Sequence, residues 1–172
     1  MTCITPPAAT AYPLLTAMAN GHPLYELRLD VTLDVPSFHG QSAFVIRPGV
    51  IDADAVELFG FAQCMYLAGA IAERVGCGHA LIERYSDDDG WQPTHVAAFL
   101  PDGLVLDIDG HRPMEQVLAD LRTLGPWPLR YRTVHTWPEA LPGRGQSWRD
   151  TLPPLNVELI SVFAERLIEG AS

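Results

Sequence analysis

Two stretches of the sequence decide the fold class, and both carry reactive side chains. The first is Gly60-Phe-Ala-Gln-Cys-Met-Tyr-Leu-Ala-Gly-Ala-Ile-Ala-Glu-Arg-Val-Gly76, and the second is Thr94-His-Val-Ala-Ala-Phe-Leu-Pro-Asp-Gly-Leu-Val-Leu-Asp-Ile-Asp-Gly110. In the first stretch apolar residues recur at helical spacing before a glycine that can end a helix. In the second, two apolar runs flank a turn signal, which is typical of a β-hairpin.

Cys64 lies on the apolar side of the predicted helix. A thiol is a nucleophile when its thiolate is stabilised, and a helix N-terminus or an imidazolium can supply that stabilisation. If Gly60 ends the preceding helix, Cys64 falls in the first turn of the next one, where the dipole favours a thiolate. If the helix continues through Gly60, Cys64 lies in mid-helix. A buried, inert thiol is the structural alternative, since free cysteines are common in cores.

The hairpin places two carboxylates near one imidazole. Leu100-Pro-Asp-Gly-Leu104 has the residues of a three-residue loop whose glycine adopts a left-handed conformation. This register predicts three opposed pairs, namely Leu100 with Leu104, Ala97 with Asp107, and His95 with Asp109. Both acids then share the face of His95, with Asp109 directly opposite and Asp107 diagonal to it. Orienting an imidazole is a reason for acids on an otherwise apolar hairpin.

The order Cys64, His95, Asp107 resembles the papain-like and transglutaminase-like superfamily of cysteine enzymes, over about residues 60–110. Arylamine N-acetyltransferases carry a similar pattern. The resemblance implies an α+β fold, with an antiparallel sheet and a helix that carries the catalytic cysteine. It favours Asp107 as the acid that orients His95, while Asp109 stays the alternative that the register favours. Gln63 before the cysteine and Met65 after it depart from the commoner family patterns, which leaves the subfamily open.

An oxyanion hole would use the backbone N–H of Cys64, with the side-chain amide of Gln63 or Gln41 as a further candidate. A zinc site formed by Cys77 and His79 with Cys64 and His95 is disfavoured because the paired ligand spacing is absent. The acidic run at residues 87–90 lacks the rest of a calcium loop. We therefore expect no metal and no cofactor.

The remaining patterns place this pair of stretches in one domain. Residues 1–23 are predicted to form an irregular N-terminal arm, and residues 24–172 a single α+β domain. Strands are predicted at 25–35, 43–47, 80–85, 94–100, 104–109 and 129–136, and helices at 53–58, 61–75, 113–124 and 155–169. Asp52 is expected to cap the first of these helices. The segment 137–154 is predicted to be an irregular loop.

Composition limits the class of protein. A 172-residue chain with 48% hydrophobic and 19% charged residues can bury a core. Its net charge of −10 argues against a nucleic-acid partner, which would require a basic face. Three cysteines do not form a paired disulfide framework, and the sequence shows neither a signal-peptide pattern nor an 18-residue apolar run. These features predict a soluble cytoplasmic protein with no membrane partner, and leave its oligomeric state open.

The sequence therefore predicts a cysteine-dependent acyl-transfer enzyme in which Cys64, His95 and Asp107 form a triad. Its reaction would be amide or peptide hydrolysis, deamidation of Gln or Asn, or transfer to an amine, on a protein or a small amide-containing substrate. By analogy with the resemblance, its size fits a bacterial or phage-encoded modifying enzyme. The alternative is a non-catalytic binding or structural module of the same fold, which docks a basic partner through its acidic surface.

Overall fold

The computed structural model describes residues 29–32, 43–61, 63–150, 152 and 154–171. The predicted arm at 1–23 and the candidate Gln41 lie outside these residues. The described elements are β1 (Leu29–Thr32), β2 (Ala43–Ile46), α2 (Ala53–Phe61), α3 (Cys64–Val75), β3 (Gly78–Ser86), β4 (Gly90–Phe99), β5 (Val105–Asp107), β6 (Gly110–Arg112), α4 (Met114–Thr123), β7 (Leu129–Val134), α5 (Trp137–Ala140) and α6 (Pro154–Ala171).

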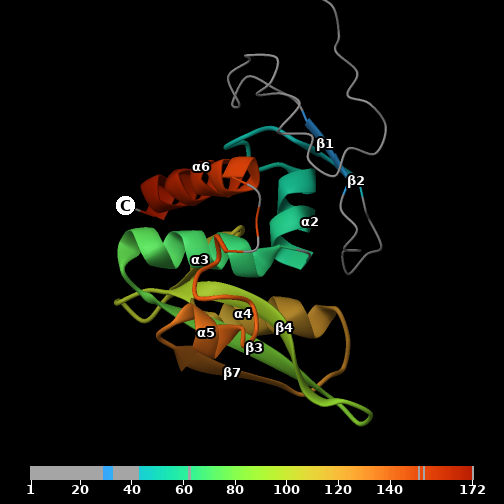
Figure 1. Cartoon of the computed structure of the whole chain (residues 1–172). Helices are drawn as coiled ribbons and strands as arrows, with labels where there is room; N and C mark the ends of the chain where they lie inside the picture. Colours follow the sequence, from blue (N-terminus) through green and yellow to red (C-terminus); the bar gives the residue numbers. More distant parts are fainter. Residues whose placement is uncertain (1–28, 33–42, 62, 151, 153, 172) are drawn as a thin grey trace, which may run out of the picture.

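The main sheet has five antiparallel strands in the order β6-β5-β4-β3-β7, and β1 pairs with β2 in a separate hairpin. This arrangement confirms the predicted α+β class with an antiparallel sheet. Helix α3 lies across one face of the sheet, with α6 on its other side and α2 beside its N-terminal end (Figure 1). The core between these helices includes Phe59, Leu67 and Phe163. Helix α4 covers the opposite sheet face through Met114 and Val117.

The corner between α2 and α3 positions Cys64. Asp52 caps α2, as predicted, because its Oδ1 accepts a hydrogen bond from the Ala55 N–H at 3.1 Å. Helix α2 ends at Phe61, and α3 begins at Cys64 at an angle of 88° to it. Cys64 is therefore in the first turn of α3 rather than in the middle of one long helix. The far end of α3 closes at Gly76, whose φ of 71° is the left-handed conformation expected of a C-cap.

The hairpin that carries Asp107 has the predicted register at its loop. The Leu100 N–H donates to the Leu104 carbonyl at 2.9 Å, and Gly103 has a φ of 85°. The predicted strand at 104–109 is wrong at its C-terminal end, since β5 stops at Asp107 and the chain turns into β6. The β4–β5 ladder holds the pairs Ala98–Leu106 and Phe99–Val105, and the predicted His95–Asp109 pair is not in it.

A β-bulge lies beside His95. The β3–β4 register shifts between Ile82, which opposes His95, and Glu83, which opposes Pro93, so Thr94 is the extra residue. Proline lacks an N–H for the ladder and is found in sheets at edges or bulges, so the irregularity accommodates Pro93 in a central strand.

The segment predicted as a loop at 137–154 includes the short helix α5 and two buried tryptophans, Trp137 and Trp148. These side chains anchor the segment against α3. Within the described part of the chain, no single helix has the length and apolar composition to cross a bilayer, although the bent α2–α3 pair passes this test when taken together.

Candidate active site

The structure brings the side chains of Cys64, His95 and Asp107 together from three elements. His95 Nε2 lies 3.0 Å from Asp107 Oδ2, and both side chains are buried. The His95 side chain also forms a hydrogen bond with the Cys64 thiol. Because Asp107 occupies Nε2, Nδ1 is the nitrogen that faces Cys64, and it lies 3.3 Å from the Gly60 carbonyl oxygen. The predicted triad residues thus form one connected row, thiol to imidazole to carboxylate.

The thiol is in an environment that favours its charged form. Burial by itself would raise the pKa of Cys64, but the charge and hydrogen bond of His95 outweigh it and the pKa is lowered. Hydrogen bonds from the backbone N–H groups of Val96 and Met65 to the sulfur act in the same direction. The first-turn position adds the helix dipole, since the first N–H groups of α3 have no partner within the helix.

The pKa of His95 is shifted in the opposite direction. Burial would lower its pKa, but the Cys64 thiolate and the hydrogen bond with Asp107 raise the pKa to about 10. The lowered pKa of the thiol and the raised pKa of the imidazole both favour a thiolate beside an imidazolium. This is the pairing that activates a cysteine nucleophile and holds a proton ready for transfer.

Asp107 is the acid that contacts His95, and both of its carboxylate oxygens accept hydrogen bonds. Its Oδ1 accepts from the Asp109 N–H at 3.0 Å, and its Oδ2 accepts from Arg112 at 2.9 Å as well as from His95. Burial would raise the pKa of Asp107, but the bonds with His95 and Arg112 hold it below its ordinary value. A carboxylate fixed in this way stays charged and holds the imidazole in one orientation.

Asp109 takes a different position. Its half-exposed carboxylate lies 2.9 Å from Arg112, and its pKa is raised by burial and by the neighbouring charge of Asp107. Asp109 occupies this position because the chain turns directly after β5, so Asp109 leaves the strand before the level of His95. Gln63 is the N-cap residue of α3, and its side chain makes no capping hydrogen bond.

Arg112 is a site residue that the sequence reasoning missed. It is 11% exposed, and its guanidinium contacts three carboxylates: Asp107 and Asp109 at 2.9 Å and Asp120 at 2.5 Å. The signal was the dipeptide Asp109-Gly110, which is typical of a hairpin turn and would have ended the strand before Asp109. In the structure Asp107 pairs with Gly110 across this turn, and Gly110 has a φ of 99°. A strand after that loop runs back alongside β5 and places Arg112 near Asp107.

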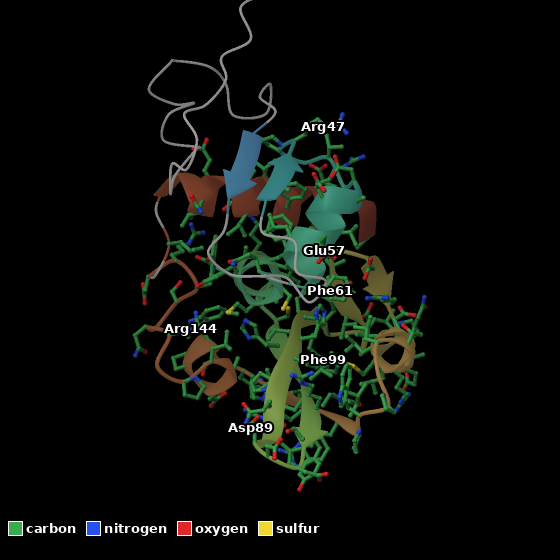
Figure 2. All side chains as sticks on the ribbon, turned by 90° about the vertical axis from the view of Figure 1, so that its right-hand side faces the viewer. Arg47, Glu57, Phe61, Asp89, Phe99 and Arg144 are labelled. Carbon is green, nitrogen blue, oxygen red and sulfur yellow. The ribbon has the colours of Figure 1, made fainter. Side chains whose placement is uncertain are left out.

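A cavity of about 150 Å³ borders the site on the α4 side. Gly60, Phe61 and His95 line it on one wall, and Val117 and Leu121 of α4 line the other. In Figure 2, Phe61 marks the corner between α2 and α3 at which this site lies. Among the residues that the structure describes, no group of three or more His, Cys, Asp or Glu side chains has the geometry to hold a metal ion.

No protein-family model, curated protein or solved structure matches this chain. The interpretation of the site therefore depends on its geometry and chemistry.

Proposed function

We propose that this protein is a cysteine-dependent acyl-transfer enzyme of papain-like or transglutaminase-like type. The observation that carries the proposal is the row formed by Cys64, His95 and Asp107, in which the thiol pKa is lowered and the imidazole pKa is raised. An inert core cysteine needs neither a buried imidazolium nor a charged acid behind that imidazolium. Nucleophilic catalysis by a thiol uses both.

The first step is attack of the Cys64 thiolate on a carbonyl carbon. The sulfur–carbon bond forms, and the carbonyl electron pair moves to the oxygen, where first-turn N–H groups of α3 can stabilise it. The Cys64 N–H and the nearby Gln63 side chain are the candidate donors. His95 then gives its Nδ1 proton to the leaving nitrogen as the carbon–nitrogen bond breaks, which leaves a thioester on Cys64 and a neutral imidazole.

The second step regenerates the enzyme. Water or an amine attacks the thioester, His95 accepts its proton, and the carbon–sulfur bond breaks to restore the thiolate–imidazolium pair. With water the net reaction is hydrolysis or deamidation, and with an amine it is transfer. Throughout both steps Asp107 orients His95 through Nε2, and Arg112 keeps Asp107 charged and in place. The substrate class is an amide-bearing protein or small molecule.

The test is a stoichiometric acyl-transfer experiment with p-nitrophenyl acetate, which needs no knowledge of the natural substrate. We expect a burst of about one p-nitrophenol per protein and an acetyl group on Cys64, located by peptide mass spectrometry. Cys64→Ser should abolish the burst. Cys77→Ser is the matched control and should retain it, because Cys77 lies outside the row. Absence of acetylation at Cys64 in the folded wild-type protein would favour the non-catalytic module instead.

A further inference from the structure

A second cavity lies toward the other end of α3. It has a volume of about 250 Å³ and is bordered by the C-terminal half of α3, the start of β3, α5 and the segment at 146–148. None of the triad residues lines it. Arg144, whose carbonyl oxygen accepts a hydrogen bond from Trp137, marks this region in Figure 2, apart from Phe61 at the active-site corner. The cavity is therefore separate from the candidate active site.

His79 is one of the polar residues that line this cavity. Its side chain is 5% exposed, and both ring nitrogens are buried without a hydrogen-bond partner in the described part of the chain. Burial lowers the pKa of His79, so the ring is neutral at physiological pH and offers one N–H donor and one nitrogen acceptor. Buried polar groups in native proteins are almost always paired, so two unpaired nitrogens on one ring point to a missing partner.

The walls of the cavity combine two tryptophan rings with polar side chains, among them Gln146 and Ser147. The Trp137 ring lies edge-on to His79 with centroids 6.2 Å apart, and Trp148 packs so closely on Gly69 that a Cβ there would lie 2.6 Å from it. Both indole N–H groups are already used, by Arg144 in one case and Glu73 in the other. The tryptophans therefore present hydrocarbon surface, and His79 supplies hydrogen-bonding capacity between them.

The carboxylate that lines the cavity is already paired with an arginine. Glu73 is the acid on its lining, and its pKa is held below the ordinary value because its bonds with Trp148 and Arg149 outweigh burial. Arg149 neutralises this carboxylate through a contact of 3.0 Å. A charged ligand would lose its hydration without gaining a counter-ion, whereas an uncharged ligand would not pay that cost.

We propose that this cavity binds a small uncharged molecule with a flat apolar body and a carboxamide group, which exchanges hydrogen bonds with His79. A carboxamide carries both an acceptor and donors, so it matches either nitrogen of the neutral ring. The volume lies just below the usual range for ligand pockets, about 300–1,000 Å³, so the ligand is smaller than a typical drug molecule. This site is independent of the proposed acyl-transfer activity.

Benzamide is the probe that tests the proposal, with benzoate and benzylammonium as charged analogues of similar shape. We expect benzamide to shift the NMR signals of the His79 ring and the Trp137 indole with a millimolar dissociation constant, and the two charged analogues to leave them unchanged. His79→Phe keeps an aromatic ring but removes the hydrogen bonds, so benzamide should bind about tenfold more weakly or not at all. His111→Phe, an exposed histidine elsewhere, should bind like wild type.

Three results would overturn the proposal. They are no shift with benzamide, equal binding of benzoate or benzylammonium, and unchanged benzamide affinity in His79→Phe. The first would mean that only water pairs with His79. If His79→Phe fails to fold, as judged by circular dichroism, the comparison of benzamide with its charged analogues on wild-type protein still decides the question.

Discussion

Each end of α3 carries a cysteine, and the two environments shift the thiol pKa in opposite directions. Cys64 begins the helix beside the imidazole of His95, and the pKa of its thiol is lowered. Cys77 follows the C-terminal cap, where burial raises its pKa and its sulfur contacts a carbonyl oxygen, that of Gly78, at 3.5 Å. Residue type alone therefore does not determine reactivity. What determines it is which end of the helix the thiol meets and which charges pack against it.

The two buried histidines of the sheet also have pKa values that are shifted in opposite directions. His95 and His79 are each 5% exposed, but the pKa of His95 is raised and that of His79 is lowered. His95 lies between the Cys64 thiol and the Asp107 carboxylate, whereas His79 has no hydrogen-bond partner among the described residues. Burial acts on both rings in the same direction, so the partners account for the difference.

The largest expected effect is on thiol alkylation. At about pH 6, iodoacetamide should label Cys64 at least about tenfold faster than Cys77, because a depressed pKa leaves a larger thiolate fraction that outweighs its lower intrinsic nucleophilicity. Peptide mass spectrometry over time measures both rates in one sample, and Cys64→Ser and Cys77→Ser confirm the assignments. Equal rates at this pH would remove the contrast between the two ends of α3 and the catalytic interpretation with it.

The next effect is on stability, and it compares Arg112, which contacts Asp107 of the candidate site, with Arg149, which contacts Glu73 of α3. Arg112→Gln should lower the free energy of unfolding by about 2–3 kcal/mol, because it breaks a largely buried pair while His95 still contacts Asp107. Arg149→Gln is the matched control. Its pair with Glu73 is nearly half exposed on both sides and should contribute less than about 1 kcal/mol. Urea denaturation measures both, and similar losses would contradict the structural difference between the two pairs.

A smaller effect separates the two acids of the hairpin. Asp107→Asn removes the charge that supports the imidazolium, so the thiol pKa of Cys64 should rise by about one unit. Asp109→Asn should shift it less, because that carboxylate contacts Arg112 and is half exposed. The pH dependence of Cys64 alkylation reports both shifts. A larger shift in Asp109→Asn would make Asp109 the third member of the triad, and no shift in either variant would reduce the triad to a dyad.

The smallest expected effect is on the pH dependence of the free energy of unfolding, to which His95 and Cys64 make opposite contributions. The raised pKa of His95 contributes stability that is lost as pH rises from its ordinary 6.5 to about 10, and the lowered pKa of Cys64 contributes stability that grows as pH rises to its ordinary 9.0. If the folded pair is a thiolate and an imidazolium, it holds one proton. The unfolded chain also holds one proton on these two groups between pH 6.5 and 9.0, so the net contribution of the pair should be constant there.

Outside this window the contribution of the pair should fall. Below pH 6.5 the unfolded histidine takes up a proton that a folded thiolate–imidazolium pair does not hold. Above pH 9.0 the unfolded thiol releases its proton while His95 keeps its own until about pH 10. The measurement is urea denaturation of wild type against the double variant Cys64→Ala with His95→Ala, across pH. A steady slope of the difference between pH 6.5 and 9.0 would show that the pair is not a thiolate and an imidazolium.

Local rules of the chain were enough to determine most helices and the hairpin loop. Asp52 before α2, the left-handed Gly76 after α3, and Pro101-Asp102-Gly103 between strands each act within a few residues, so the sequence predicts them directly. The same holds for the proximity of a histidine and two acids on one hairpin. Their order relative to Cys64 was also sufficient to suggest the chemistry.

Only the tertiary structure decided which acid serves His95 and what surrounds each end of α3. The early turn after Asp107 removes Asp109 from the strand, and Arg112 returns beside Asp107. The bond between Glu73 and Trp148 joins residues 75 positions apart. Contacts of that separation depend on how whole elements pack, and burial and charge at a thiol or an imidazole depend on those contacts, so the sequence places the reactive groups but packing determines their protonation and partners.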